Sequence, residues 1–363
     1  MKNNITNLDI KNFKSIKNIK MDCKRINVFI GEPNVGKSNI LEALSLYITQ
    51  MCDNEKPVLK DYIRYEKFSN LFYDQDRKNV VSVRSNIGGV YLRYHMNAID
   101  AYDIAIGPNG LLDGLLERGD TQLHYVESDI NIEKYKDSIV KPFYYVVKLE
   151  EEKFNLSQRQ YIDLKDNNPI KRYIFKSLTN HKNRFPLFLR PPFGDNLFTT
   201  LENNPSLYDE VTHFFSKYGL DLLLDTELGK LEVQKRVGNR VYKIPYSLAA
   251  DTLQRIIFHL SAIETNDDSI LLLEEPEAHS FPPYISLLAE KIVESKNNQF
   301  FVATHSPYIL TAFIEKCTFD EVAIFICSYE NYETKVRELS KEELDNIMDT
   351  GIDLFYNIPA FKK

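Results

Sequence analysis

Residues 31–38, Gly-Glu-Pro-Asn-Val-Gly-Lys-Ser, have the types and spacing of a loop that binds a chain of phosphates. Gly31 and Gly36 let the backbone curl, so that its N–H groups can point at a phosphate. Lys37 supplies mobile positive charge that also serves catalysis, and the Ser38 hydroxyl is a ligand for Mg²⁺. The loop therefore predicts a site for ATP and Mg²⁺. The residues expected to contact the nucleotide are Gly31, Asn34, Gly36, Lys37, Ser38 and Asn39.

A pair of adjacent carboxylates, Glu274 and Glu275, ends the apolar run at residues 270–273. Two acids at the end of a buried strand are costly unless they serve a metal or a reaction. We expect Glu274 to hold the Mg²⁺ shell and Glu275 to accept a proton from the attacking water. Without the phosphate-binding loop, the same pattern would indicate only a strand that enters solvent.

His305 follows another apolar run, Phe-Phe-Val-Ala-Thr at residues 300–304. Such a run predicts a buried strand, and parallel α/β sheets place their ligand sites at the carboxyl ends of strands. An imidazole there can hydrogen-bond the γ-phosphate and position water. A lone histidine is more often structural, but the order of the motifs favours a catalytic role for His305.

The elements that must position these residues follow from periodicity. Residues 26–30 are almost continuously apolar, as in a strand buried on both faces, and residues 39–48 have helical spacing of apolar side chains. Strand, glycine loop and helix come in the order that a phosphate site requires. Further strands are predicted at 5–13, 143–149, 269–275 and 299–306, hairpins at 79–94 and 229–243, a strand pair at 322–339, and helices at 251–263, 283–295 and from 340. We expect Asp251 and Ser340 to cap the helices that begin there.

The composition limits the class of protein. The chain has 363 residues, 43% of them hydrophobic, and a net charge of −7, which predicts a packed domain. A protein that coats nucleic acid over its whole surface is normally basic, so any DNA contact must be local. The cysteines are scattered, which favours free thiols in a reducing cytosol over a metal site. With no signal peptide and no apolar run of about 18 residues, we expect a cytoplasmic protein without membrane contact. The cysteines are Cys23, Cys52, Cys317 and Cys327.

Taken together, these segments resemble the ABC-type ATPase head shared by RecF, SMC proteins and the overcoming-lysogenization-defect (OLD) nucleases. The resemblance rests on LDIKNFKSI, INVFIGEPNVGKSNILEAL, LLLEEPEAHSFPP and FVATHSPYIL, and it covers approximately residues 5–50 and 187–312. It implies an α/β P-loop NTPase fold with a β-rich lobe and an inserted α-helical subdomain. It also implies one ATPase domain over 1–363, divided into 1–150, 151–250 and 251–363, that forms a homodimer around ATP and Mg²⁺.

The resemblance assigns further roles. Glu277, Ala278 and His279 occupy the position of the D-loop, which in the family touches the second subunit. Gln75 is the candidate for the Q-loop glutamine that contacts the nucleotide and senses Mg²⁺, although the sequence fits an exposed loop residue nearly as well. Lys14 lies where the family often has a basic residue near the nucleotide.

One loop departs from the family pattern. The signature loop of relatives offers a serine and glycines to the γ-phosphate of the opposite subunit, whereas residues 249–251 are Ala-Ala-Asp. A carboxylate there repels phosphate unless Asp251 caps its own helix, and Ser247 or Thr252 could replace the hydroxyl. We therefore hypothesise a dimer that closes weakly or hydrolyses ATP slowly without a partner. Glu274 is a smaller departure, because most relatives have Asp.

The resemblance leaves several functions open. OLD nucleases append a metal-binding TOPRIM domain, and the roughly 50 residues after Leu310 are too few for one, so we expect no intrinsic nuclease activity. The leading hypothesis is an OLD-like, AAA-family regulatory ATPase that acts, as a dimer or a higher assembly, on a separate effector such as a nuclease in prokaryotic antiphage defence. The alternatives are a RecF-like DNA repair or recombination clamp and a scaffold that binds ATP without hydrolysing it.

Two basic stretches are candidate DNA contacts. Solvated faces are the more common reason for such charge runs, so DNA stays an open partner. The first stretch comprises Lys171, Arg172, Lys176, Lys182 and Arg184, and the second comprises Lys235, Arg236, Arg240 and Lys243 on the later hairpin.

Overall fold

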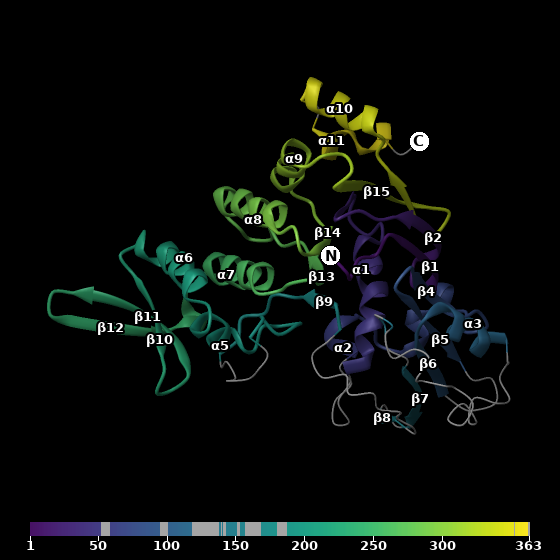
Figure 1. The fold of residues 1–363 in the computed structure, drawn as a ribbon, viewed down its shortest axis with the longest axis horizontal. Coiled ribbons are helices and arrows are strands. Elements are labelled where there is room, and N and C mark those ends of the chain that lie inside the picture. The colour runs from purple at the N-terminus through teal and green to yellow at the C-terminus, as the bar shows by residue number, and fades with distance from the viewer. Residues whose placement is uncertain are drawn as a thin grey trace.

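A six-stranded sheet positions the chemistry of this protein (Figure 1). The computed structural model describes residues 1–51, 59–94, 101–117, 138, 140, 143–150, 153–156, 168–179, 187–351 and 353–361. The sheet order is β16-β15-β3-β14-β13-β9. Neighbours from β15 to β9 are parallel, and β16 pairs antiparallel at one edge, so the carboxyl ends of β3, β13 and β14 lie side by side. The strands are β3 (Ile26–Gly31), β9 (Ile170–Tyr173), β13 (Ile270–Glu274), β14 (Gln299–Ala303), β15 (Val322–Glu330) and β16 (Glu333–Glu338).

Both faces of this sheet are covered, as continuous apolar runs predict. Because side chains alternate along a strand, Val28 and Ile30 of β3 join one hydrophobic cluster and Phe29 joins another. The first cluster includes side chains of α7 (Asp251–Glu264), α8 (Pro282–Glu294) and α9 (Pro307–Lys316). The second includes α1 (Lys37–Ser45), so α1 and the later helices pack on opposite faces.

A seven-stranded antiparallel sheet shares the second cluster with α1 and forms the β-rich lobe. The hairpin predicted at 79–94 is confirmed as β4 and β5, with Ser85 opposite Gly88. The order is β2-β1-β4-β5-β6-β7-β8, made of β1 (Asn7–Phe13), β2 (Ile16–Asp22), β4 (Val81–Ser85), β5 (Gly88–Tyr94), β6 (Ala101–Gly107), β7 (Phe143–Glu150) and β8 (Lys153–Leu156). The described helices of this lobe are η1 (Leu46–Met51), α2 (Leu59–Tyr62), η2 (Phe68–Leu71), η3 (Tyr73–Gln75) and α3 (Asn109–Glu117).

The inserted subdomain combines helices with a three-stranded sheet that projects away from the six-stranded sheet (left in Figure 1). The hairpin predicted at 229–243 is confirmed as β11 and β12, and β10 adds a third strand beside β11. Every residue of β12 is exposed. The elements are α5 (Leu197–Glu202), α6 (Pro205–Ser216), β10 (Asp221–Asp225), β11 (Lys230–Val237), β12 (Arg240–Pro245) and η6 (Tyr246–Leu248).

Helix ends test the two predicted caps. At α10 (Lys341–Thr350), the Ser340 hydroxyl accepts the N–H of Glu343 at 3.2 Å and the Glu343 carboxylate accepts the N–H of Ser340 at 2.8 Å, which confirms that cap. The cap predicted for α7 is wrong. Asp251 is the first residue of that helix, and the cap position belongs to Ala250, whose side chain has no acceptor. The chain then continues through α11 (Leu354–Asn357) and η7 (Ile358–Phe361).

The three consecutive parts expected within the domain interleave in space. The six-stranded sheet takes β3 from residues 1–150, β9 from 151–250 and its other strands from 251–363. The site at the ends of these strands therefore belongs to no single part. Cys23, Cys317 and Cys327 are free thiols, and Cys52 lies outside the described residues. None of the helices within the described ranges has the length and apolar character needed to cross a membrane.

Candidate active site

The loop at residues 31–38 joins the end of β3 to the first turn of α1. Its backbone is left-handed at two points, with φ of 63° at Asn34 and 94° at Gly36. A Cβ on Gly36 would lie 2.1 Å from Oγ1 of Thr334, and one on Gly31 would lie 2.4 Å from the carbonyl O of Cys327. The neighbouring strands β15 and β16 therefore leave room only for glycine at both positions. The N-terminus of α1, the positive end of the helix dipole, follows directly.

Lys37 is buried against this loop. Its Nζ donates hydrogen bonds to the carbonyl O of Gly31 at 3.0 Å and to that of Glu32 at 2.9 Å. Burial lowers the pKa of Lys37, and the nearby charges of Glu275 and Glu274 oppose the shift. A cation held by neutral carbonyls can exchange them for phosphate oxygens, which make stronger charge-assisted bonds.

Ser38 and Glu274 meet between β3 and β13. Ser38 hydrogen-bonds the Glu274 carboxylate. Burial alone would raise the pKa of Glu274, but Arg172, the Ser38 hydroxyl and Arg64 outweigh it and hold that pKa below its ordinary value. A hydroxyl and an ionised carboxylate are oxygen ligands that Mg²⁺ accepts. Asn39 is engaged elsewhere, because its Nδ2 donates to Oγ of Ser15 at 2.7 Å.

Glu275 and His305 face each other across the ends of β13 and β14. Oε1 of Glu275 lies 3.6 Å from Nε2 of His305, and the Glu275 side chain is half exposed. The backbone of Glu275 is left-handed, with φ of 43°, which turns the chain sharply at the strand end. Burial lowers the pKa of His305, the charge of Lys37 lowers it further, and Glu275 opposes them. The pair thus offers a water-accessible carboxylate beside an imidazole that stays neutral at neutral pH.

A cavity of about 600 Å³ over the loop brings these residues together. The predicted residues that line it are Asn34, Gly36, Lys37, Ser38, Asn39, Glu274, Glu275 and His305, together with Ala278 of the D-loop. Gly31 lies beneath it, at the end of β3. Gln75 is exposed on η3 outside this cavity, so the structure does not bring it to the other site residues.

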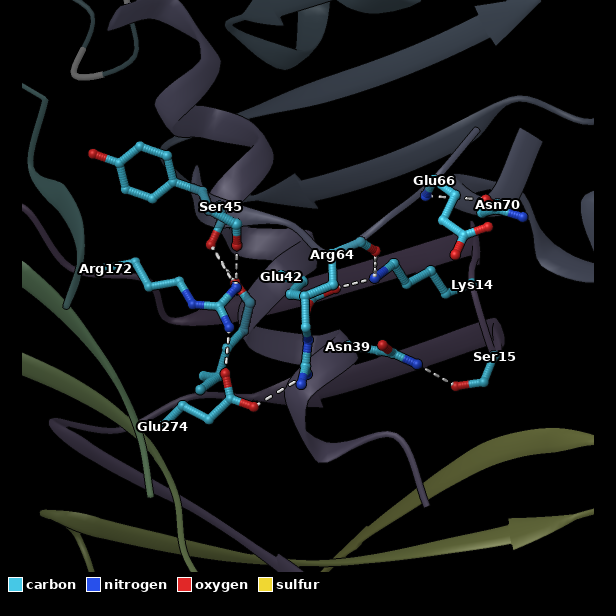
Figure 2. A network of polar contacts seen from close by, with 12 residues as sticks. Lys14, Ser15, Asn39, Glu42, Ser45, Arg64, Glu66, Asn70, Arg172 and Glu274 are labelled. Atoms are coloured by element: carbon cyan, nitrogen blue, oxygen red, sulfur yellow. Dashed lines mark hydrogen bonds and ion pairs between the residues drawn. The ribbon is translucent and has the colours of Figure 1, made fainter. Parts of the chain in front are cut away.

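A network of charged side chains beside the cavity is absent from the sequence-based prediction (Figure 2). Glu274 pairs with Arg172 and, at 3.2 Å, with Arg64. Arg64 also pairs with Glu42 at 2.8 Å, and Lys14 contacts the same carboxylate. The Glu42 side chain is fully buried, so these cations are the partners that a buried carboxylate requires. The basic residue near the N-terminus, Lys14, therefore reaches the site through this network.

Two members of the first basic stretch are buried, which corrects their assignment as DNA contacts. Lys171 and Arg172 lie in β9. Nζ of Lys171 donates to Oδ1 of Asn266 at 2.6 Å, and Arg172 pairs with Glu274. Both cations serve internal pairing and cannot reach a phosphate backbone outside. Lys182 and Arg184 lie outside the described residues.

Residues at the start of α7, where the chain departs from the family pattern, make contacts within the chain. Oδ2 of Asp251 pairs with Nε of Arg255 at 2.6 Å, so its charge goes to a side chain rather than to helix N–H groups. The Thr252 hydroxyl donates to the carbonyl O of His279 at 2.8 Å. Thr252 thus links the start of α7 to the D-loop, and its proton is already engaged.

The donor set suits a nucleotide with Mg²⁺. The loop N–H groups, the start of α1 and Lys37 match the charge of a phosphate chain. Within the described residues, no three His, Cys, Asp or Glu side chains gather as a metal cluster. The Ser38 hydroxyl beside the Glu274 carboxylate fits Mg²⁺, which keeps several waters and takes one or two protein ligands beside phosphate.

Comparison with known proteins places the chain in a family. A model described as "AAA ATPase domain" matches residues 1–217, which is more than half of the 363 residues. The chain belongs to this AAA ATPase family. A second model, whose description names an AAA domain, the AbiEii toxin and a type IV toxin–antitoxin system, matches residues 149–311 of the AAA ATPase.

Individual relatives are more distant. The AAA ATPase is 22% identical over 320 residues to an "ATP/GTP phosphatase" from Helicobacter pylori, covering 83% of this chain and 85% of the relative. An SMC head solved with the C-terminal winged-helix domain of ScpA is 16% identical, with a TM-score of 0.49, covering 93% of this chain and 98% of that one. The SMC head domain from Thermotoga maritima is 14% identical, with a TM-score of 0.41, covering 93% and 99%.

These findings confirm the α/β P-loop fold class and the general assignment to nucleotide-binding ATPases. They also confirm that the chain is an ATPase. Residues that line this cavity without a role assigned from the sequence include Arg64, Phe175, Arg255, His259 and Tyr329. Arg172, which pairs with Glu274, had been assigned from its basic run to DNA contact.

Proposed function

We propose that this AAA ATPase binds ATP with Mg²⁺ in the cavity over residues 31–38 and hydrolyses it there. The observation that carries the proposal is the convergence of five side chains on that cavity from the ends of three adjacent parallel strands. These are Lys37, Ser38, Glu274, Glu275 and His305. Such a set matches the parts that phosphoryl transfer to water requires.

Each residue has a task that its position permits. Lys37 and the loop N–H groups hold the phosphates, and Ser38 and Glu274 hold Mg²⁺, which neutralises phosphate charge when bound. Glu275 accepts the proton of the attacking water on its exposed carboxylate. His305, 3.6 Å away, orients that water and hydrogen-bonds the γ-phosphate.

The surface around the cavity supports a dimer closed around ATP. Leu248, Phe281 and Tyr308 are 71%, 58% and 53% exposed. They adjoin in sequence the 249–251 loop, the D-loop and His305, and Ala278 of the D-loop and His305 line the cavity. Large apolar side chains grouped around a charged site favour burial by a second copy.

The dimer's output is the regulation of a separate effector protein, such as a nuclease, in a prokaryotic antiphage system. The matching model whose description names a type IV toxin–antitoxin system supports a role of this kind. The Ala-Ala-Asp sequence at residues 249–251 supports slow turnover without a partner, as expected of a switch. The free thiols fit a cytoplasmic protein.

The test is the mass of the purified protein with and without ATP and Mg²⁺. The Glu275→Gln variant should accumulate as an ATP-bound dimer, because it keeps the binding groups and lacks the base. Wild type should dimerise transiently and return to monomer as ATP is consumed. A wild-type protein without Mg²⁺-dependent affinity for nucleoside triphosphates would refute the proposal.

The exposed hairpin of β11 and β12 favours one alternative, a RecF-like DNA repair or recombination clamp. Its basic residues Lys235, Arg236, Arg240 and Lys243 remain in solvent, unlike Lys171 and Arg172. A clamp of this kind would close on DNA when ATP binds. The other alternative is a scaffold that binds ATP without hydrolysing it. Its output would be the same in wild type and in Glu275→Gln.

A further inference from the structure

Both oxygens of the Glu274 carboxylate are held by arginines (Figure 2). Nη2 of Arg172 donates to Oε2, and Nη2 of Arg64 donates to Oε1 at 3.2 Å. Arg172 comes from β9, the strand beside β13, whereas Arg64 follows α2. The residue assigned to Mg²⁺ is therefore clamped from two sides.

The two contacts differ in how firmly they are held. The Arg172 side chain is 2% exposed, and its Nη1 donates to the carbonyl O of Tyr62 at 2.5 Å and to Oγ of Ser45 at 3.4 Å. The Arg64 side chain is 71% exposed, and it lines the cavity. Nη2 of Arg64 can therefore leave Oε1 while its Nε stays on Glu42, whereas Arg172 stays fixed on Oε2.

The register of the strands explains why this position holds glutamate. Arg172 lies opposite Leu272, two residues before Glu274. A guanidinium at the end of a long side chain and a glutamate together bridge this offset. Aspartate is one methylene shorter and would draw the carboxylate back from Arg172.

We propose that Arg172 is a positioning residue for the ATPase reaction, which holds Oε2 of Glu274 and so presents Oε1 to Mg²⁺ in exchange for Arg64. This rests on the proposed function, because it takes Glu274 as the residue that holds the metal. A positive charge by itself opposes a metal ion. The contribution of Arg172 therefore lies in its rigid fork, which a lysine ammonium does not reproduce.

A matched pair of variants separates geometry from charge. Arg172→Lys keeps the charge and removes the fork. Lys171→Arg, on the same strand, exchanges a buried cation that instead contacts Asn266 and Ser269 at 2.6 and 3.2 Å. The measurement is binding of a fluorescent ATP analogue at fixed concentration while Mg²⁺ is titrated. Arg172→Lys should raise the half-saturating Mg²⁺ concentration about tenfold, the size typical of losing a residue that orients a metal ligand, and Lys171→Arg should change it less than about twofold.

The possible results test the positioning role of Arg172 and the proposed function separately. The positioning role would be overturned if Arg172→Lys and Lys171→Arg shifted the half-saturating Mg²⁺ concentration equally. It would also be overturned if Arg172→Lys kept a normal Mg²⁺ requirement while Arg172→Met did not. Wild type that binds the analogue without any need for Mg²⁺ would overturn the proposed function itself. A wild type that needs Mg²⁺, beside an unaffected Arg172→Lys, would overturn only this inference.

A second variant changes Glu274, the acid of this ion pair, and leaves the buried Arg172 unchanged. Glu274→Asp keeps the carboxylate and shortens the side chain away from Arg172. It should raise the half-saturating Mg²⁺ concentration. Adding Arg172→Lys should raise that concentration little further, because both substitutions break the same contact between Arg172 and Glu274. A Glu274→Asp protein that binds Mg²⁺ and the analogue as tightly as wild type would overturn the proposal. Melting temperatures of every variant establish that the compared proteins are folded.

Discussion

Oε1 of Glu277 accepts the backbone N–H of His305 at 2.7 Å, and so joins the D-loop to the histidine at the end of β14. The same oxygen accepts the hydroxyl of Thr304 at 2.7 Å. Glu277 is half-buried, and burial raises its pKa, against which the hydrogen bonds from His305 and Thr304 act. The position of His305 therefore depends on a residue that the sequence comparison assigned to contact with a second subunit.

We predict that Glu277→Ala lowers both turnover and stability. It leaves the His305 N–H without this acceptor, at a cost of about 1–3 kcal/mol in the free energy of unfolding. Loss of the oriented imidazole should reduce kcat by roughly 10²-fold, the size of a displaced acid–base group, with little change in KM. Steady-state kinetics and thermal unfolding measure both. Glu277→Gln is the control, because its amide oxygen still accepts, and a kcat equally low in both variants would count against this role.

A second prediction concerns acid stability. His259 in α7 is fully buried, and burial lowers its pKa to about 4, against a hydrogen bond to the carbonyl O of Arg255. The folded state therefore keeps His259 neutral below pH 6.5, where the unfolded chain binds a proton. The unfolded state thus binds more protons between pH 6.5 and about 4, and stability falls as the pH falls through this window.

The measurement is the free energy of unfolding by urea across that window. His259→Gln should remove up to roughly 3 kcal/mol of its pH dependence, the equivalent of the shift between the two states. His213→Gln, at an exposed position of α6, serves as the control and should leave the dependence unchanged. Parallel curves for wild type and His259→Gln would show that another group dominates acid unfolding.

The sequence predicted the parts of the site that depend on local order. The loop at 31–38 and the pair Glu274 and Glu275 are each contiguous with a buried strand, so strand, turn and chemistry could be inferred together. The contacts of Arg172 and Arg64 with Glu274 could not be inferred from the sequence. Arg172 meets it only because β9 pairs with β13, and Arg64 is 210 residues away in the chain.

The errors have physical causes of the same kind. The segment that contains Lys171 and Arg172 is rich in charge, which ordinarily indicates solvent. Its cations are instead buried, because each finds acceptors on elements from elsewhere in the chain. Asp251 was assigned as a cap, but its carboxylate pairs with Arg255 four residues later on the same helix. The acceptors of Lys171 and Arg172 could not be chosen from spacing, whereas Arg255 lies at the i+4 position that helical spacing offers to Asp251.

A third prediction addresses DNA. Neutralising the β11–β12 hairpin, by changing Lys235, Arg236 and Arg240 to Gln, should leave affinity for duplex DNA weak and unchanged. The chain has a net charge of −7, and Lys243 of the same hairpin is paired with Glu232 at 2.8 Å. The measurement is binding to a labelled duplex as a function of salt. If the hairpin held DNA, the slope of log K against log salt would fall by about 0.9 for each lost phosphate contact, and the clamp function would replace the regulatory one.

The last prediction concerns the proposed slow turnover without a partner. Ala249 lies in the loop whose counterpart in similar proteins offers a serine hydroxyl to the phosphate bound by the second subunit. The backbone of Ala249 is held in place, because its carbonyl O accepts a hydrogen bond from Nε2 of Gln254 at 2.8 Å. Ala249→Ser adds a donor without moving that contact. If donors in this loop limit hydrolysis, kcat should rise by about tenfold, below the 10²–10³ typical of a fully preorganised donor, because the added hydroxyl has no partner to orient it.

The control for Ala249→Ser is Asp251→Asn, which removes charge near the same loop and keeps the size of the side chain. Arg255 already neutralises Asp251 at 2.6 Å, so this change should have little effect on kcat. Both variants are compared by steady-state hydrolysis and by the fraction of dimer at saturating ATP. A faster Asp251→Asn beside an unchanged Ala249→Ser would mean that repulsion by the carboxylate, and not the missing hydroxyl, limits closure. Fast hydrolysis by wild type alone would remove the basis for both.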